Sequence, residues 1–507
     1  MRASPVLLMI FDGFGLNPSR KYNAWALAKT PHLDEYFANN PHSALQASGT
    51  FVGLPDGQFG NSEVGHQTLG SGRVLEQELT RIAKACANGD LSKNENWQAL
   101  LKAGSKLHLI GLVSDGGVHS HLSHLLAMLE LLVAADVEPV IHMVCDGRDT
   151  SPKSSKKYLE KLQAALKDLG KGYVATVSGR FFTMDRANNW DRTKIAYDAI
   201  MQGNGVFAET PEQAIDQSYG KDAFDEFIEP TVIGELGAMG VALDEEVLFF
   251  NFRSDRVRQL SAAIGLESFD AFELPDGYQR KVTTLTRYQE EFPFPVLFEP
   301  NVPEKVLAEV ISAAGKKQFH CAEKEKYPHV TYFFNGGIET PFEGEDRVMV
   351  ASPKVKTYDL QPAMSSPEVA DELIKAIESK QYDFVLVNFA NGDMVGHAAK
   401  QDSVIKSVEA LDECSHRVID VALKHDFRVL MTADHGNCDE MVDPITGEPH
   451  TQHTNYPVPF LLLGEKEVEL GNGRGLADIA PTVLHLMGIE QPEEMTGTSL
   501  ILDGSLL

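Results

Sequence analysis

Short apolar runs rich in β-branched residues alternate along the chain with amphipathic segments of helical periodicity. Runs of this length predict buried strands, and the longer periodic segments predict helices. The clearest predicted strands are Val6–Phe11, Leu107–Val113, Pro139–Val144, Tyr173–Val177, Val247–Phe252, His329–Phe334, Phe384–Phe389, Arg428–Thr432 and Val458–Leu463. Predicted helices include Leu122–Val133, Ser154–Leu169, Pro367–Ser379, Val404–Lys424 and Leu476–Met487. The alternation predicts an α/β fold with mainly parallel sheets.

Polar motifs come directly after six of these strands. DGFG follows Val6–Phe11, SDGGVHSH follows Leu107–Val113, CDGRDT follows Pro139–Val144, SGR follows Tyr173–Val177, NGD follows Phe384–Phe389 and ADHGN follows Arg428–Thr432. Each motif by itself reads equally well as an ordinary turn. Open α/β sheets bind ligands beyond the carboxyl ends of their strands. For six motifs that all lie in that position, a functional site is a better explanation than six unrelated turns.

The chemistry of the motifs separates the chain into an outer and a central part. Acids and histidines gather near the two ends, at Asp12 and Ser62 and again from Asp393 to His453, whereas arginine motifs occupy the middle. The simplest organisation is one domain built from both ends, residues 1–74 and 304–507, with a second domain, residues 75–303, inserted between them. The second boundary carries the clearer signal, because four prolines lie between Phe292 and Lys305.

A candidate metal site is formed by acids and histidines of the C-terminal region. Asp393 and His397 have the i,i+4 spacing that places two side chains on one face of a helical turn. Asp434 and His435 directly follow a strand, as Asp12 does, and His453 precedes another. Carboxylates and imidazoles together suit borderline divalent ions such as Mn²⁺ or Zn²⁺. Any one of these residues is more often structural, so the prediction depends on the group.

Ser62 lies in the glycine-rich segment GNSEVGH. One interpretation makes Ser62 the cap of a helix, with Glu63 in its first turn. The other makes it a nucleophile whose hydroxyl is activated by metal coordination, at a helix N-terminus that favours phosphate. The local sequence supports both equally.

Arginine recurs after the strands of the central region, at Arg148, Arg180, Arg186, Arg253 and Arg256. Guanidinium groups capture carboxylate and phosphate in a bidentate manner. Surface ion pairs are the alternative, since Asp185 and Asp255 adjoin arginines. His119 and Asp149 add groups able to exchange protons. Lys326, in EKEKY, is a candidate phosphate contact or else a solvated lysine of a charged run.

These motifs occur in an order that identifies a family. LPDGQFGNSEVGH, SDGGVHSH, CDGRDT, SGRFFTMDR, NFRSDR, EKYPHVTYFFNGG, NFANGDMVGH, TADHGN and HTNYPVPF together cover nearly the whole chain. The sequence resembles the cofactor-independent phosphoglycerate mutases of the alkaline phosphatase superfamily. The resemblance implies an alkaline-phosphatase-like metal domain with an inserted α/β phosphotransferase domain. It also implies an isomerase that interconverts 3-phosphoglycerate and 2-phosphoglycerate through a phosphoserine.

The resemblance further implies a role for each motif residue. One metal ion would take Asp393, His397 and His453, and the other would take Asp12, Ser62, Asp434 and His435. Ser62 would carry the phosphoryl group, and Asp149 would shuttle a proton at the substrate hydroxyls. Substrate would be held by His119, Arg148, Asp149, Arg180, Arg186, Arg253, Arg256 and Lys326. His450 lies in the same stretch as His453 and is an alternative ligand.

Two divalent ions are implied, usually Mn²⁺, and these ligands would also accept Co²⁺ or Zn²⁺; no bisphosphoglycerate is required. A metal-dependent phosphatase or phosphopentomutase of the same superfamily is the alternative activity, although neither would need the arginine motifs. A metal-stabilised binding protein is the non-enzymatic alternative, and the intact ligand set argues against it.

Charge and cysteine content narrow the partners and the compartment. The formal net charge of −28 disfavours binding to nucleic acid or to an anionic membrane, so a phosphate site must be a local basic pocket. The five cysteines form no CxxC pair, which favours a reducing cytoplasm. The first residues do not form a signal peptide, and no apolar stretch reaches the length of a membrane span. We expect a cytoplasmic monomer whose partner is a small molecule, phosphoglycerate.

Overall fold

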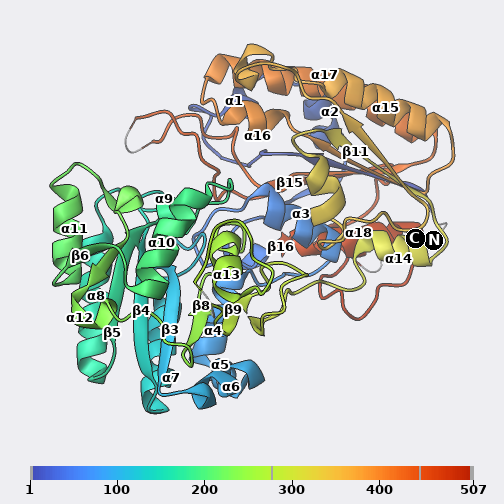
Figure 1. Ribbon diagram of the computed structural model, residues 1–507. Helices are drawn as coiled ribbons and strands as arrows, with labels where there is room; N and C mark the ends of the chain where they lie inside the picture. The colour runs from blue at the N-terminus through green and yellow to red at the C-terminus, as the bar shows by residue number, and fades with distance from the viewer. Residues whose placement is uncertain (1–3, 276–277, 445–446, 503–507) are drawn as a thin grey trace. The chain divides into compact units, whose positions relative to one another are not determined.

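The computed structural model of the 507-residue chain describes residues 4–275, 278–444 and 447–502. The chain divides into two compact units. Unit 1 comprises Met1–Gln77 and Asn301–Leu507, and unit 2 comprises Glu78–Pro300. Each unit is built on a sheet for which eight strands are described, covered by helices on both faces (Figure 1).

The sheet of unit 1 has the strand order β12-β11-β13-β1-β14-β15-β2-β16. Its strands are β1 (Val6–Phe11), β2 (His42–Gln46), β11 (Gln318–Glu323), β12 (Glu345–Val350), β13 (Phe384–Phe389), β14 (Arg428–Thr432), β15 (Val458–Leu463) and β16 (Arg474–Gly475). β1 pairs in parallel with both neighbours, so Val6 lies opposite Phe384 on one side and Arg428 on the other. β15 runs antiparallel to both β14 and β2. The N-terminal strand is therefore the centre of a sheet made largely from the C-terminal third of the chain.

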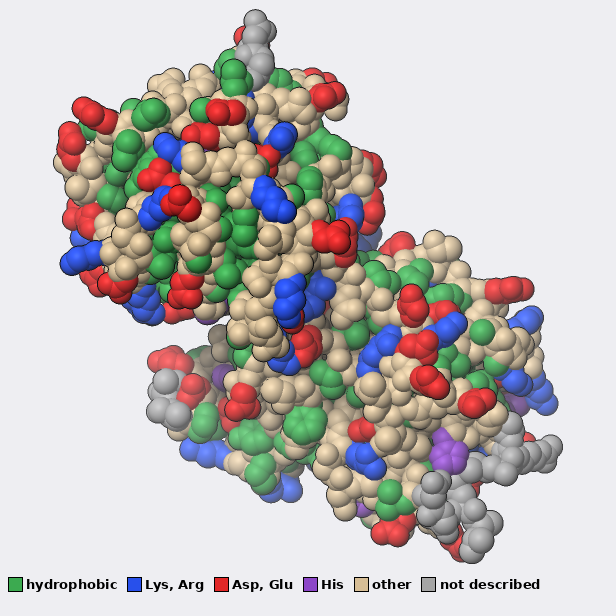
Figure 2. All heavy atoms as spheres, turned by 90° about the horizontal axis from the view of Figure 1, so that it is seen from below, with side chains coloured by type: hydrophobic (Ala, Val, Ile, Leu, Met, Phe, Trp, Pro, Cys, Tyr) green, Lys and Arg blue, Asp and Glu red, His purple; other side chains and the backbone are tan. Residues whose placement is uncertain are grey.

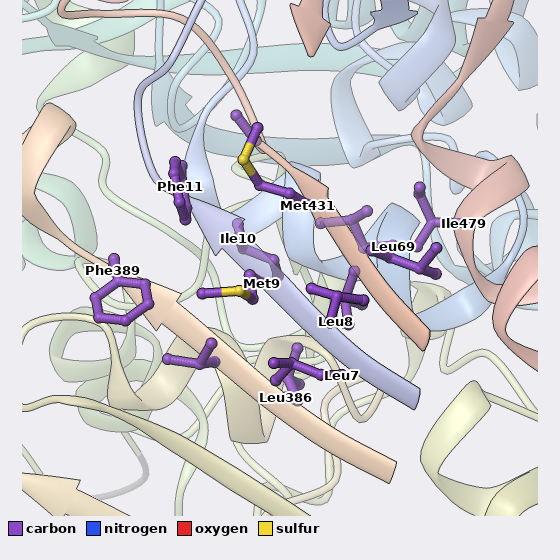
Figure 3. Packing of buried hydrophobic residues seen from close by; sticks show 14 of the residues in the cluster. Leu7, Leu8, Met9, Ile10, Phe11, Leu69, Leu386, Phe389, Met431 and Ile479 are labelled. Carbon is purple, nitrogen blue, oxygen red and sulfur yellow. The ribbon is translucent and has the colours of Figure 1, made fainter. Parts of the chain in front are cut away.

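Helices enclose this sheet from both sides (Figure 1). α15 (Ser366–Glu378) and α17 (Gln401–Lys424) cover one face, and α3 (Ser62–Ser71), α14 (Leu307–Ala313) and α18 (Ile479–Met487) cover the other. The shorter helices are α1 (Ala24–Leu27), α2 (Pro31–Asn39) and α16 (Asn391–Gly396). Every residue of β1 is buried, and Leu69 of α3 and Ile479 of α18 lie beside Leu8 (Figure 3). A strand covered on both faces has a continuous apolar sequence, as VLLMIF does.

The sheet of unit 2 has the strand order β10-β9-β8-β3-β4-β5-β7-β6. Its strands are β3 (Lys106–Leu112), β4 (Glu138–Cys145), β5 (Tyr173–Gly179), β6 (Val206–Ala208), β7 (Thr231–Ile233), β8 (Glu246–Phe249), β9 (Val282–Thr286) and β10 (Val296–Phe298). The pairing of β5 with β7 is antiparallel, and the other ladders are parallel.

Two hydrophobic cores lie on the two faces of this second sheet. Leu109 and Ile141 point into the core that contains α7 (Leu122–Ala134) and α8 (Ser155–Leu169), whereas Ile110 points into the core that contains α10 (Trp190–Gln202) and α13 (Arg258–Gly265). Successive residues of a strand face opposite sides of a sheet, which explains the division. The remaining helices of the unit are α4 (Glu78–Ala87), α5 (Asp90–Lys93), α6 (Glu95–Ala103), α9 (Arg180–Thr183), α11 (Pro211–Tyr219) and α12 (Gly234–Gly237).

The predicted α/β class is confirmed, but the predicted strand His329–Phe334 is wrong. His329–Phe333 forms a wide helical turn instead. The run is aromatic and β-branched, which favours a strand. However, Pro328 before it has helical backbone angles, φ −60° and ψ −27°, and the turn buries Val330 and Phe334 in the core of unit 1. Tertiary packing here overrides the local preference.

The charged side chains seen on the surface agree with the net charge of −28 (Figure 2). On the face drawn in Figure 2, acidic side chains are widely spread and basic side chains lie among them. Within the described ranges, no helix combines the length and the apolar character needed to cross a membrane.

Candidate active site

Four neighbouring strands of unit 1 each lead into a polar side chain at the same edge of the sheet. In the order β11-β13-β1-β14, these side chains are Lys326, Asp393, Asp12 and Asp434. Parallel strands bring their carboxyl ends together, so residues up to 422 positions apart in sequence meet here. We call this group, together with Ser62, His397, His435 and His453, the acid–histidine cluster.

Asp393 lies against two of the predicted histidine ligands. Its Oδ1 is 3.2 Å from His397 Nε2 and 3.1 Å from His453 Nε2. Nδ1 of His397 lies 2.8 Å from the carbonyl of Thr451, and Nδ1 of His453 lies 2.8 Å from that of Gly60. A carbonyl can only accept, so each Nδ1 donates to it, and each Nε2, which faces the Asp393 carboxylate, is the ring nitrogen left to bind a metal.

The choice between the two histidines of the PHTQH stretch follows from their positions. The ring of His453 stacks on that of His435 with centroids 3.8 Å apart, inside the cluster. His450 instead bonds through Nδ1 to the backbone carbonyl of Glu440 at 3.1 Å. Of these two histidines, His453 therefore lies in the acid–histidine cluster and His450 does not.

The hydroxyl of Ser62 faces the second half of the cluster. Its Oγ is 3.0 Å from His435 Nε2 and donates to Asp12 Oδ1 at 3.3 Å. The cap of α3 is Asn61, whose side chain accepts from the backbone N–H of Val64. Capping does not occupy Ser62, which is the first residue of the helix, so its hydroxyl is available for chemistry.

Lys326 is not a solvated lysine. Its side chain is 3% exposed, and Nζ donates to Asp12 Oδ1 at 2.8 Å, to Asp393 Oδ2 at 2.7 Å and to Ser62 Oγ at 2.7 Å. Burial opposes its charge, but the carboxylates, Asp12 first, raise the pKa of Lys326 above its ordinary value. The ammonium therefore stays charged between two acids and the candidate nucleophile.

His66 belongs to the site although the sequence analysis did not select it. It follows Ser62 by one helical turn, and its Nδ1 lies 3.2 Å from Asp434 Oδ2. Asn388 lies 3.1 Å from His66 Nε2 and donates to Asp12 Oδ2 at 2.7 Å. The sequence does contain a signal for His66, because it lies four residues after Ser62. Asp393 and His397 have the same i,i+4 spacing.

The chemistry of the cluster fits divalent metal ions. Two groups of side chains, Asp393 with His435 and His453, and Asp12 with His66 and Asp434, bring their ligand atoms within 4.8 Å of one another. Asp434 Oδ2 is buried and has no hydrogen-bond partner among the described residues, because the nearby His66 Nδ1 bonds to the backbone carbonyl of Ser62 at 2.9 Å instead. A buried carboxylate oxygen without a partner raises the free energy of the folded state unless a bound cation neutralises its charge. Oxygen and imidazole donors of this kind suit Mn²⁺, Co²⁺ and Zn²⁺.

The arginines of unit 2 also lie beyond the carboxyl ends of neighbouring parallel strands. β8, β3, β4 and β5 are neighbours in the sheet, and each leads into predicted binding residues. Arg253 and Arg256 follow β8, His119 follows β3, Arg148 and Asp149 follow β4, and Arg180 and Arg186 follow β5. We call the five arginines the arginine cluster.

Arg180 is the buried member of the arginine cluster. Its Nη1 donates to Asp146 Oδ1 at 2.7 Å and to Asp149 Oδ2 at 2.5 Å. Asp146, which the sequence analysis passed over, also accepts from the backbone N–H groups of Arg148 and Asp149 and from the hydroxyl of Ser114. It therefore fixes the loop that carries two predicted binding residues.

The other members of the arginine cluster are more exposed. The side chains of Arg148 and Arg186 are each 54% exposed. Burial, and then the like charges of Arg180, Arg186 and Arg148, lower the pKa of Arg256. Burial, followed by the charge of Arg180, lowers the pKa of His119 to about 4, so this imidazole is neutral and can exchange a proton.

Comparison with known proteins places the chain in a family. Residues 4–491 match the model of the Metalloenzyme superfamily. A 2,3-bisphosphoglycerate-independent phosphoglycerate mutase of Clostridium novyi is 47% identical, covering 99% of this chain and 100% of the relative. The chain belongs to this mutase family. A member from Moorella thermoacetica is 48% identical, with 99% of each chain covered.

A solved structure agrees with this assignment. The phosphoglycerate mutase of Leishmania mexicana, determined at low cobalt concentration, aligns with a TM-score of 0.71 and 32% identity. The alignment covers 99% of this chain and 98% of the Leishmania chain. Family membership thus extends over both units, and the resemblance stated from the sequence motifs is confirmed.

Proposed function

We propose that the protein interconverts 3-phosphoglycerate and 2-phosphoglycerate through a phosphoryl group held on Ser62. The position of the Ser62 hydroxyl carries this proposal, since it lies 2.7 Å from a buried ammonium and 3.0 Å from an imidazole nitrogen at the start of a helix. Phosphoryl transfer depends mainly on positioning and on neutralising charge. Full-length relatives named as mutases support this activity over that of a phosphatase or phosphopentomutase.

Two divalent ions, Mn²⁺ in our proposal, would be held by the acid–histidine cluster. Asp393, His397 and His453 would bind one ion, and Asp12, Ser62, Asp434 and His435 would bind the other. When bound, the ions would neutralise phosphate charge and favour the deprotonated serine. Lys326 acts in the same direction, because its donation to Ser62 Oγ stabilises an oxyanion there.

The arginine cluster would hold the glycerate. Guanidinium groups with unused N–H donors suit the carboxylate and the phosphate of the substrate. Asp149 would take and return the proton of the glycerate hydroxyls, with its carboxylate oriented by Arg180 and with His119 3.8 Å away. The acid–histidine cluster belongs to unit 1 and the arginine cluster to unit 2.

We further propose that the enzyme is a cytoplasmic monomer that needs no bisphosphoglycerate. The five cysteines are all free thiols, and four of them are buried, which suits a reducing compartment. Light scattering of the purified protein tests the oligomeric state.

An enolase-coupled assay tests the activity directly. Protein stripped of metal by a chelator should be inactive, and Mn²⁺, Co²⁺ or Zn²⁺ added singly should restore turnover of 3-phosphoglycerate without bisphosphoglycerate. Release of inorganic phosphate should stay far below the rate of isomerisation. Steady phosphate release at the rate of isomerisation would identify a phosphatase instead.

A further inference from the structure

Asp255 is an acid placed among the groups proposed to bind the substrate anion. Its Oδ2 accepts a hydrogen bond from Arg186 Nη1 at 2.7 Å. Its Oδ1 lies 3.5 Å from Arg253 Nε and 3.7 Å from His119 Nδ1. One carboxylate thus faces three groups at once, although nothing in the proposed reaction uses it.

The contacts of Asp255 are incomplete. Its Oδ1 and the Nδ1 of His119 are both buried, and neither has a hydrogen-bond partner among the described residues. The side chains of Arg186 and Arg253 remain 54% and 51% exposed. Asp146, by contrast, accepts four hydrogen bonds and has a side chain 1% exposed. Asp255 is therefore a loosely bound anion, whereas Asp146 is a fixed part of the fold.

The surrounding cations need more negative charge than the fold supplies. Burial, and then the like charges of Arg180, Arg186 and Arg148, lower the pKa of Arg256, and the carboxylate of Asp255 offsets them only in part. The hydrogen bond found for Arg256 goes to the backbone carbonyl of Met184 at 3.5 Å, and a carbonyl brings no net charge. An anion entering the cluster would be attracted by Arg256 and would meet Asp255 as a competitor.

We propose that Asp255 is an internal competitor of the substrate, a specificity-determining carboxylate that occupies Arg186 and Arg253 until an anion displaces it. The proposal rests on the proposed function only in the choice of phosphoglycerate as the natural anion. The side chain of Asp255 is 27% exposed, so it can turn towards solvent when it is displaced. A phosphate carries about −1.5 to −2 charges at pH 7 and displaces a single carboxylate more readily than a monoanion does.

The proposal predicts an effect opposite in sign to that of a supporting residue. If Asp255 competes, replacing it with the neutral isostere should strengthen anion binding. If Asp255 merely aligns Arg186, the same change should weaken binding. We expect Asp255→Asn to tighten the binding of inorganic phosphate by about two- to fivefold, the range expected for one partly exposed ion pair.

Calorimetric titration of the full-length protein with inorganic phosphate separates these outcomes. Chelator-treated protein is used so that metal does not contribute phosphate binding in unit 1. Asp255→Glu keeps the charge and should bind phosphate as the wild type does. Asp198→Asn, which removes a carboxylate from the Lys194 ion pair on α10, controls for the change in total charge. Adding Arg256→Ala to Asp255→Asn should abolish the gain and so assign it to the arginine cluster.

Turnover provides a second readout. Asp255→Asn should lower the KM for 3-phosphoglycerate while kcat stays equal or falls, because product release must then break tighter contacts. A folded variant with unchanged or weaker phosphate affinity would overturn the proposal, as would phosphate binding that is undetectable in both wild type and variant. The calorimetric result does not depend on turnover. If the protein had no mutase activity, the proposed function would be refuted, but the competition between Asp255 and phosphate could still be measured.

Discussion

The ammonium of Lys326 lies 2.7 Å from the hydroxyl oxygen of Ser62 in a site that holds both side chains almost out of water. The same ammonium joins Asp12 and Asp393, which belong to the two different proposed metal sites. One side chain of the protein therefore supplies a fixed positive charge between two of the proposed metal ligands. Substitution at either end of this contact should therefore have a measurable effect.

Ser62→Ala should abolish mutase turnover while leaving the fold intact. The substitution removes only the hydroxyl, and we expect a loss on the order of 10³-fold or more, as for a nucleophile that no neighbour replaces. The measurement is the enolase-coupled rate, with circular dichroism as the control for folding. Incorporation of labelled phosphate into the wild type and not into the variant would support the phosphoserine. A variant that retains even a tenth of the rate would refute it.

Lys326→Met should destabilise the metal-free protein more than the metal-loaded protein. Removing the lysine leaves Asp12 and Asp393 buried without their cation, which costs about 3–5 kcal/mol for a broken buried pair. Bound Mn²⁺ would compensate the same carboxylates. The measurement is urea unfolding with chelator and with Mn²⁺, and Lys324→Met, on an exposed lysine two residues earlier, is the control. Equal losses in both conditions would show that the metal and the lysine act on different charges.

A buried pair of histidines in unit 2 should make stability depend on pH. His142 Nε2 lies 2.9 Å from His108 Nδ1, and His142 Nδ1 lies 3.0 Å from Thr176 Oγ1. The other ring nitrogen of His108, Nε2, lies 2.9 Å from Glu245 Oε2. Burial, followed by the charge of His108, holds the pKa of His142 well below its ordinary value.

The sign of the effect follows from proton linkage. In the unfolded chain His142 binds a proton near pH 6.5, whereas in the folded chain it does not, so stability is lost as the pH falls below about 6.5. His142→Gln removes this titration, and its unfolding free energy should fall by about 2 kcal/mol less than that of the wild type between pH 7 and pH 5. Denaturant unfolding at the two pH values measures this. Parallel losses in wild type and variant would mean that other groups control acid stability.

Gly65→Ala should impair catalysis through the position of α3. A Cβ at residue 65 would come within 2.8 Å of both the Cβ and the backbone oxygen of Asp434, so the helix must move away from the end of β14. Ser62 lies on the same helix, and a displacement of about 1 Å can cost on the order of 10²-fold in rate. Gly104→Ala is the control, because its nearest neighbour is Lys106 O at 3.9 Å. Normal kcat in Gly65→Ala would show that the site tolerates this shift.

The sequence could predict those parts of the site that depend on a single strand. Asp12 and Asp434 follow apolar runs directly, and the rule that strands deliver ligands at their carboxyl ends was sufficient to select them. Asp393 and His397 share one helical turn, so their spacing alone showed that they can face one site.

Other features depended on contacts between elements that the sequence does not show. Lys326 reads as a solvated lysine until β11 is known to lie beside β13, which brings its side chain to Asp393. Asp255 reads as part of a surface ion pair until β8 is known to lie beside β3, which brings it to His119. The strand order decides both interpretations, and local propensity contains no information on strand order.

The central position of β1 has a consequence for the synthesis of the chain. This strand pairs with β13 and β14, which the ribosome makes more than 370 residues later, whereas the strands of unit 2 are contiguous in sequence. At 5–20 residues per second, VLLMIF stays without its partners for about 20–75 s. In ribosome-stalled chains ending near residue 340, Glu78–Pro300 should already resist protease while Met1–Gln77 is still cleaved. Ser62, the proposed nucleophile, is thus among the first residues to be made, and its surroundings are among the last to form.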